Sequence, residues 1–265
     1  MGTETHRARR GSAFVFNRIP HRMSTPQASV ILAAAGAGRR FAEGGTDAAP
    51  AAPKVLAPLA GRPVLAHALE AFAAVEAVAE VVVAVPPDGV DRARETFGKS
   101  VAGPRPLVVV VGGKTRPESV ARALEASDGG TELVAIHDGA RPLIRPAVIE
   151  EALRVAVEHG AAVVGRPVDH TIKMVAEDGR VTETVPRRTL WMAHTPQVFR
   201  REIITEACGR RGDMVGRVTD DAQLVEALGR TVRMVRGDAA NIKITTPEDL
   251  RACEALLAAG WPFET

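Results

Sequence analysis

Short apolar runs alternate with segments of helical periodicity along most of the chain, and this alternation restricts the fold more than any other feature. The pattern is typical of a mostly parallel β-sheet that carries helices on both faces. The apolar runs predict strands near residues 29–34, 80–85, 107–111, 132–136, 161–165 and 231–236. Because 46% of the 265 residues are hydrophobic, the chain can bury the core that such a sheet needs. We therefore expect an α/β fold built on a single Rossmann-like sheet.

Helix signals lie between the predicted strands. Residues 63–78 place apolar side chains at helical spacing, which predicts a helix packed on the sheet. Residues 219–228 form a second helical pattern, and Thr219 is its predicted cap. Thr246 precedes Pro-Glu-Asp in a capping-box pattern, so the last helix is expected to begin there.

Two stretches interrupt this alternation. Residues 42–53 lack apolar periodicity and are predicted to form a loop. Residues 166–190 are polar and favour two strands around the turn at 177–179. Because an isolated two-stranded ribbon is marginally stable in water, this segment is expected to protrude as a β-arm that packs on something else.

The N-terminal segment is basic and poor in acidic residues. Its first 23 residues contain one acidic residue, Glu4, against five arginines: Arg7, Arg9, Arg10, Arg18 and Arg22. We interpret residues 1–27 as a disordered tail ahead of a domain that spans 28–265. A start at Met23 and an organelle transit peptide are the alternatives for this tail.

Composition argues against several classes of partner. The formal net charge of +2 is dispersed, and the chain has nine aromatic residues and no Tyr, so a nucleic-acid surface is not expected. No apolar run approaches the ~18 residues that span a bilayer, so no membrane association is expected. Cys208 and Cys253 form no C-x-x-C pair, which favours a reducing, cytoplasmic location, with organellar import through the tail left open.

A glycine-containing turn follows the first predicted strand. Gly36 and Gly38 lack Cβ atoms, so backbone N–H groups there can face an anion, and Arg39, Arg40 and Lys54 supply positive charge. The segment lacks both the final G-K-[ST] of a P-loop and the G-x-G-x-x-G of a dinucleotide fold. The pattern therefore indicates a phosphate site of another type.

This entrance segment resembles that of nucleotidyltransferases, which join a polyol or sugar phosphate to a nucleoside monophosphate. Four later segments occur in the order expected for one family: residues 112–119, 137–142, 190–197 and 241–249. Over about residues 29–258 the chain resembles the 2-C-methyl-D-erythritol 4-phosphate cytidylyltransferases of isoprenoid-precursor biosynthesis. The resemblance implies an enzyme that uses CTP, Mg²⁺ and a polyol phosphate.

By the same resemblance, three cationic side chains carry the transfer: Arg40, Lys54 and Lys243, with Arg39 as the alternative to Arg40. Positive charge suits this task because the reaction joins a triphosphate to a monophosphate and negative charge grows on the transferred group. The positions matching the nucleotide site are Ala34, Ala35, Gly36, Gly38, Gly112, Gly113, Ser119 and Asp138. Gly112, Gly113 and the Ser119 hydroxyl are expected to read the cytosine edge.

Asp138 follows the apolar strand at 132–136, where the carboxyl ends of parallel strands place ligands. It is the predicted metal ligand, since a carboxylate can share Mg²⁺ with substrate phosphates. A turn-forming role at Gly139 is the structural alternative. The second metal ligand stays open between Asp238 and Asn241, because Ala240 stands where the family pattern often has Asp.

The acceptor phosphate is expected to contact Arg141, Thr171, Arg187 and Thr195, which match the family's polyol-phosphate positions. Thr171 and Arg187 lie in the arm, and in the family this arm clasps a second subunit. The resemblance therefore implies a homodimer whose acceptor sites are built from two chains. The histidines at 137, 170 and 194 flank these motifs and are interpreted as packing groups or as groups that support the site residues from behind, since no proton transfer requires them.

Two other functions stay open at this point. A ribitol 5-phosphate cytidylyltransferase shares the entrance turn and the segments at 112–119 and 137–142, although the segments at 190–197 and 241–249 favour methylerythritol phosphate. A non-catalytic nucleotide sensor is the alternative of another class. The missing dinucleotide fingerprint argues against NAD, and cations aimed at a transferred phosphoryl group are superfluous in a sensor.

Overall fold

The computed structural model describes residues 26–36, 41, 54–97, 105–210, 212 and 218–262, and the structural statements below concern these residues. Gly38, Arg39, Arg40, the whole predicted loop at 42–53 and all of the predicted tail except residues 26–27 lie outside them.

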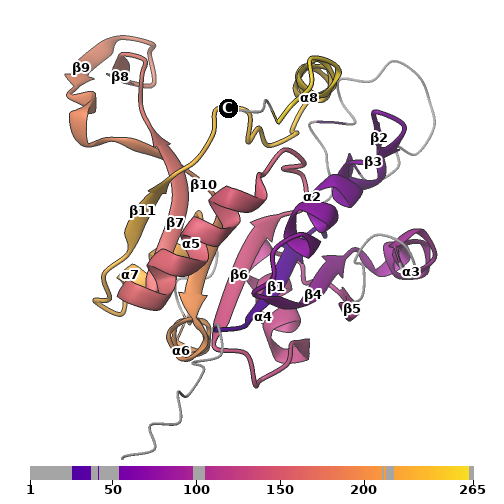
Figure 1. The fold of residues 1–265 in the computed structure, drawn as a ribbon. Coiled ribbons are helices and arrows are strands. Elements are labelled where there is room, and N and C mark those ends of the chain that lie inside the picture. The colour runs from indigo at the N-terminus through magenta and orange to yellow at the C-terminus, as the bar shows by residue number, and fades with distance from the viewer. Residues whose placement is uncertain are drawn as a thin grey trace, which may run out of the picture.

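A seven-stranded sheet forms the centre of the fold, in the order β11-β7-β10-β6-β1-β4-β5 (Figure 1). Its strands are β1 (Ala28–Ala33), β4 (Val78–Val85), β5 (Leu107–Val111), β6 (Leu133–Asp138), β7 (Ala161–Pro167), β10 (Trp191–Arg200) and β11 (Arg233–Arg236). Strands β6, β1, β4 and β5 pair in parallel, and so do β11 and β7. The prediction of a mostly parallel sheet is confirmed.

Strand β10 was not predicted from the sequence, and it runs antiparallel between β6 and β7. Its second half is buried, whereas Trp191 and Met192 are each 38% exposed. The strand therefore lacks the continuous apolar run that marked the parallel strands.

Helices cover both faces of the sheet. Successive side chains of a strand point to opposite faces, so Leu32 of β1 belongs to one core cluster and Ile31 to another. Helices α2 (Val64–Ala73), α3 (Val90–Phe97) and α5 (Pro146–His159) pack into the first cluster, and α4 (Arg116–Ala126), α6 (Arg201–Gly209) and α7 (Ala222–Glu226) pack into the second. Helix α8 (Pro247–Ala258) packs on a third cluster with the small hairpin β2 (Pro58–Leu59) and β3 (Arg62–Pro63).

Two predicted helices differ from the observed ones. The helix expected over 63–78 ends at Ala73, because the chain turns there and enters β4 at Val78. The helix expected over 219–228 is α7, and its N-cap position is Asp221 rather than Thr219. The Asp221 side chain makes no capping bond, whereas Asp220 Oδ1 accepts from the Gln223 amide at 3.1 Å. The Thr219 amide donates to Gln223 Oε1 at 2.7 Å, so this residue closes the turn before the helix. The capping box at Thr246 is confirmed.

The predicted β-arm is present. Strands β8 (Ile172–Val175) and β9 (Val181–Val185) form an antiparallel ribbon, followed by a short 3₁₀ turn at Arg187–Thr189. Figure 1 shows this ribbon projecting beyond the ends of β7 and β10, away from the helices. Three of its apolar side chains are exposed: Met174 is 53% exposed, and Val175 and Val181 are each 54% exposed.

Candidate active site

Two adjoining cavities lie at the carboxyl ends of the central strands. The first has a volume of about 310 Å³ and is lined by Ala33, Ala34, Ala35, Gly36, Lys54, Val55, Gly113, Lys114, Thr115, Arg116, Ser119, Asp138, Ala140 and Lys243. The second has a volume of about 200 Å³ and is lined by Arg116, Asp138, Arg141, Ala193, His194, Thr195, Gln197, Thr219, Asp220 and Lys243. Three charged residues, Arg116, Asp138 and Lys243, belong to both linings, so they stand where the cavities meet.

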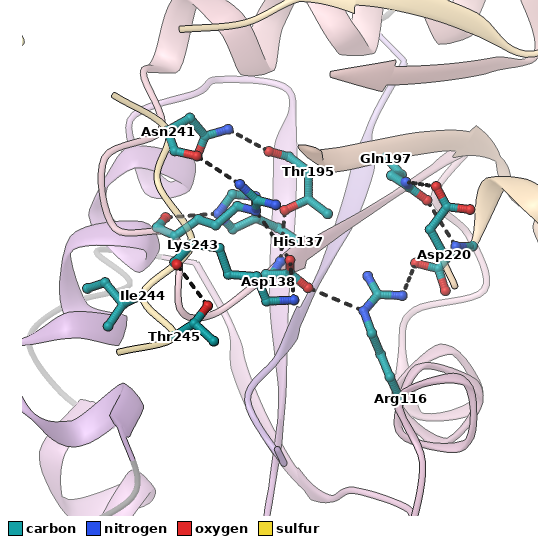
Figure 2. Close-up of polar contacts among 12 residues, drawn as sticks. Arg116, His137, Asp138, Thr195, Gln197, Asp220, Asn241, Lys243, Ile244 and Thr245 are labelled. Atoms are coloured by element: carbon teal, nitrogen blue, oxygen red, sulfur yellow. Dashed lines mark hydrogen bonds and ion pairs between the residues drawn. The ribbon is translucent and has the colours of Figure 1, made fainter. Parts of the chain in front are cut away.

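Asp138 is the last residue of β6, and its register partner in β1 is Ala33, the last residue of that strand. Its carboxylate is surrounded by three cations: Arg116 Nε lies 3.2 Å from Oδ1, Arg141 Nε 3.2 Å from Oδ2, and Lys243 Nζ 3.0 Å from Oδ2 (Figure 2). Burial opposes ionisation, but these three cations outweigh it and hold the pKa of Asp138 well below its usual range. The carboxylate is therefore a fixed negative charge.

Arg116 begins helix α4 directly after the turn that contains Gly112 and Gly113. Besides Asp138, it contacts the buried Asp221, whose Oδ2 accepts from Nη1 at 2.6 Å. Burial lowers the pKa of Arg116, but the two carboxylates outweigh burial and raise it above its ordinary value. The guanidinium thus bridges two acidic residues that are far apart in the sequence.

Two of the three predicted transfer cations meet at the site. Lys54 lines the first cavity, and its Nζ donates to the backbone carbonyl of Ile244 at 3.1 Å. Lys243 precedes that residue, and its side chain is 41% exposed and lines both cavities. The third predicted cation, Arg40, lies outside the described residues, as does its alternative, Arg39.

The glycine turn beside the first cavity is closely packed. A Cβ atom on Gly112 would lie 2.4 Å from the Cβ of Ala35, and one on Gly113 would lie 2.2 Å from the Cβ of Glu118. The Ser119 hydroxyl accepts from the Gly113 amide at 3.0 Å and donates to the Thr115 carbonyl at 2.9 Å. These bonds show Ser119 shaping the loop that was predicted to read the base.

The second cavity contains the predicted acceptor residues Arg141 and Thr195. The Thr195 hydroxyl accepts from the Asp138 amide at 3.0 Å and donates to His137 Nδ1 at 3.0 Å, and His137 Nε2 donates to the Arg141 carbonyl. Burial lowers the pKa of His137 to about 4, so its ring is neutral. His137 therefore connects Thr195 to Arg141 as a structural group.

His194, which was interpreted from the sequence as a packing or supporting group, lines the second cavity. Its Nδ1 is buried and has no hydrogen-bond partner among the described residues. Burial lowers its pKa to about 4, with Arg141 and Arg166 adding to the shift. The two predicted arm residues, Thr171 and Arg187, are exposed and stand outside both linings, and Arg187 donates to the Asp169 carbonyl.

A metal ion at this site would be held chiefly by substrate phosphates, because the carboxylate that stands there, Asp138, already faces three cations. In the described part of the chain, no group of three or more His, Cys, Asp or Glu side chains is placed to hold a metal. Asp238 faces Arg145, which donates to both carboxylate oxygens at 2.8 Å. Asn241 donates to the Thr195 carbonyl at 2.9 Å, and its own Oδ1 is buried with no hydrogen-bond partner among the described residues. A single protein carboxylate with substrate phosphates is an arrangement that Mg²⁺ accepts.

Three residues at the site were not predicted from the sequence: Arg116, Asp221 and Gln197. Asp221 lies 105 residues from Arg116, and no local pattern links the two positions. Arg116 had one available signal, because it closes the G-G-x-x-R stretch that was already linked to the nucleotide.

The model of the family described as 2-C-methyl-D-erythritol 4-phosphate cytidylyltransferase (IspD) matches residues 28–259. The chain belongs to this family. An IspD relative from Caldanaerobacter subterraneus is 41% identical over 77% of this chain and 90% of its own. One from Pelotomaculum thermopropionicum is 41% identical over 87% of this chain and 94% of its own.

The fold agrees with solved IspD structures. A 4-diphosphocytidyl-2C-methyl-D-erythritol synthase from Anaerococcus prevotii aligns with a TM-score of 0.74 and 28% identity, covering 88% of this chain and 99% of that one. The family resemblance read from the sequence is thus confirmed over nearly the same residues. Each helix that the structure describes is too short or too polar to cross a membrane.

Proposed function

We propose that this IspD family member transfers CMP from CTP to 2-C-methyl-D-erythritol 4-phosphate, releasing pyrophosphate and forming a CDP-polyol for non-mevalonate isoprenoid synthesis. The observation that carries the proposal is the shared wall of Arg116, Asp138 and Lys243 between two cavities. Two phosphate-bearing substrates must meet at one phosphorus atom, and two cavities with a charged junction suit that requirement. The first cavity would hold CTP, and the second the acceptor.

In this reaction an oxygen of the acceptor phosphate attacks the α-phosphorus of CTP in line. The new P–O bond forms as the bond to the bridging oxygen breaks, and pyrophosphate leaves with the electron pair. A phosphate monoester has its second pKa near ~6 and is largely dianionic at neutral pH, so the protein need not supply a general base. His137 would not serve as one, because both of its ring nitrogens are hydrogen-bonded within the protein, to Thr195 and to the Arg141 carbonyl.

The protein's task is to stabilise negative charge. Lys54 and Lys243 would contact the triphosphate, with Arg40 as the third cation of the transfer. Asp138 would hold Mg²⁺, which supplies positive charge to the phosphate oxygens when bound. Gly112, Gly113 and Ser119 would form the cytosine-reading loop, in which backbone groups approach the base edge.

The acceptor assignment rests on the family. The named relatives are methylerythritol phosphate cytidylyltransferases, which supports this acceptor over ribitol 5-phosphate. Within the second cavity, Arg141 supplies a guanidinium for the acceptor phosphate, and Thr195 retains one oxygen lone pair for a polyol hydroxyl.

A pyrophosphate-release assay tests the proposal. Purified protein is screened with four nucleoside triphosphates against methylerythritol phosphate and ribitol 5-phosphate, with and without Mg²⁺. Release is expected when CTP, Mg²⁺ and methylerythritol phosphate are together. Equal or faster turnover with ribitol 5-phosphate would assign the other acceptor. Tight CTP binding without turnover on any acceptor would support a sensor instead.

The arm completes the acceptor site of a second subunit in this proposal. Its exposed apolar residues, including Met174, Val175 and Val181, need a partner surface, and Thr171 and Arg187 lie outside the second cavity of their own chain. Arg187→Ala is expected to raise KM for the polyol phosphate while leaving CTP binding nearly intact.

Subunit mixing tests this arrangement directly. Arg187→Ala and Lys54→Ala chains are each expected to have low activity, and a mixed dimer contains one site assembled from two unmutated halves. Exchange of subunits, verified by tagged copies, should therefore restore part of the activity. Exchange without recovery would mean that each chain completes its own site.

We place the enzyme in the cytoplasm. Cys208 and Cys253 are both buried and unbridged, as expected of a protein in a reducing compartment. Fractionation of the source cells with an antibody to the chain tests this location, and recovery in an organelle would identify the basic N-terminal segment as an import signal.

A further inference from the structure

We propose that Arg116 is a further catalytic residue, whose free guanidinium nitrogen contacts the transferred phosphoryl group, and that the buried Asp221 is its positioning residue. The inference rests on the proposed transfer reaction and assigns a residue that the three predicted cations do not include. Four observations carry it, beginning with location. Arg116 shares the junction of the two cavities with Asp138 and Lys243, where the α-phosphorus and the attacking oxygen must meet.

The second observation is how Arg116 is held. Its Nε donates to Asp138 Oδ1 at 3.2 Å, and its Nη1 donates to Asp221 Oδ2 at 2.6 Å. Because a guanidinium is planar, these two bonds fix the direction of the third nitrogen, Nη2. Among the described residues none accepts a hydrogen bond from Nη2. Figure 2 shows this group of Arg116 pointing between Asp138 and Gln197, which both line the second cavity.

The third observation is the anchoring of Asp221, whose side chain is 1% exposed. A buried carboxylate is expected to be paired, and Arg116 is its ion-pair partner here. The backbone amides of Asp221 and Ala222 both donate to Gln197 Oε1 at 3.0 Å. Asp221 is thereby tied to β10, the strand that also carries Thr195.

The fourth observation is the contrast with Lys243. The Lys243 side chain is 41% exposed, whereas that of Arg116 is 26% exposed and is tied at two nitrogens. A preorganised donor stabilises developing charge without reorganising during the reaction, and losing one such contact lowers a rate by roughly 10²–10³. Arg116 is therefore held at more points than Lys243, which suits a contact with the transition state.

The test compares Arg116→Lys and Arg116→Gln with wild-type enzyme in the pyrophosphate-release assay. Lysine keeps the charge, but its compact ammonium group cannot reproduce the planar fork by which arginine reaches two separate carboxylates and directs a third nitrogen elsewhere. In both variants kcat is expected to fall about 100-fold. The KM for CTP and the KM for the polyol phosphate should each change by less than about threefold. Using two variants keeps the test valid if one of them fails to fold, and circular dichroism melting checks each.

A double-mutant cycle separates positioning from packing. If Asp221 acts through Arg116, Asp221→Asn lowers kcat about tenfold in the wild-type background but has little further effect beside Arg116→Lys. If Asp221 has a packing role instead, the kcat losses of Asp221→Asn and Arg116→Lys should multiply in the double variant. Arg201→Lys is the matched control, because Arg201 bonds Thr131 and Ser127 away from both cavities and should change stability but not kcat.

The outcomes are distinct. An inactive wild-type protein would refute the proposed function. An active wild type with unchanged kcat in both Arg116 variants, or with a change confined to KM, would overturn the inference alone. Multiplicative loss in the double variant would remove the positioning role of Asp221.

Discussion

Asp138→Asn is expected to destabilise the fold by an amount that can be worked out from its contacts. The substitution removes the negative charge that faces Arg116, Arg141 and Lys243 at 3.0 to 3.2 Å and leaves these cations behind. Arg116 keeps Asp221 as a partner, and Lys243 is exposed enough to reach water. The cation that is left buried without its counter-ion is therefore mainly Arg141, whose side chain is 10% exposed.

Breaking a buried ion pair by removing one partner costs about 3–5 kcal/mol, whereas an exposed pair contributes at most about 1 kcal/mol. Asparagine retains one oxygen that can accept a hydrogen bond, so we expect a cost at the lower end of the range for a buried pair. We expect the free energy of unfolding to fall by about 3 kcal/mol at neutral pH. With a urea m-value of about 3 kcal/mol/M, the midpoint should shift by about 1 M.

Urea unfolding followed by circular dichroism measures this change. Asp238→Asn is the matched control: Asp238 also faces an arginine, Arg145, but its side chain is 20% exposed, so about 1 kcal/mol is expected. A loss for Asp138→Asn no larger than that of the control would refute the view of Asp138 as a buried counter-ion.

The difference in unfolding free energy between wild type and Asp138→Asn should depend on pH with a definite sign. The folded pKa of Asp138 lies below the unfolded value of about 3.9, so its stabilisation is complete above that pH and is lost as pH falls toward the folded pKa. The difference between wild type and Asp138→Asn should thus stay constant from pH 7 to about pH 5 and shrink below about pH 4. A difference that already shrinks near pH 6 would point to another group.

Three other perturbations probe separate parts of the site. Lys54→Ala should lower kcat about 100-fold with a smaller change in KM for CTP, and a change chiefly in KM would demote Lys54 to substrate binding. Gly112→Ala should raise KM for CTP about tenfold, because the new Cβ would lie 2.4 Å from the Cβ of Ala35. Gly129→Ala is the control, since a Cβ there would meet no atom within 4 Å, and the same KM for CTP in both variants would show that the loop moves to accommodate the Cβ. The ring of His137, with its pKa lowered to about 4 by burial, should show no NMR titration between pH 8 and 6, so titration near 6.5 would contradict its burial as a neutral group.

The parallel part of the sheet could be predicted because its strands are buried on both faces. Strands such as β4 and β6 carry almost continuous apolar residues, which need no partner information to be recognised. Strand β10 could not be predicted in the same way, since its first half lies at the exposed base of the arm. The predicted cap at Thr219 was wrong for a related reason. Thr and Asp are both common N-cap residues, so the sequence does not distinguish Thr219 from Asp221, whose amide is held by Gln197 of β10.

The candidate site shows the same contrast between residues found from local motifs and residues brought together by the tertiary structure. Asp138 and Lys54 could be proposed from motifs that are local in sequence, and the structure brings both to the first cavity. The Arg116–Asp221 pair joins segments 105 residues apart and depends on the position of β10. Its existence is a property of the tertiary structure, which a pattern of neighbouring residues does not record.

The antiparallel insertion of β10 explains how the carboxyl end of β6 can serve two phosphate-bearing ligands. Pairing of β10 with β6 brings Thr195 to Asp138, whose amide donates to the threonine hydroxyl at 3.0 Å. The same strand places Gln197 against the amides of Asp221 and Ala222, and so fixes the carboxylate that holds Arg116. The end of β6 thus faces the glycine turns on one side and β10 on the other. A change that shifts β10 should therefore disturb the second cavity and Arg116 together, while leaving the packing of Gly112 against Ala35 in place.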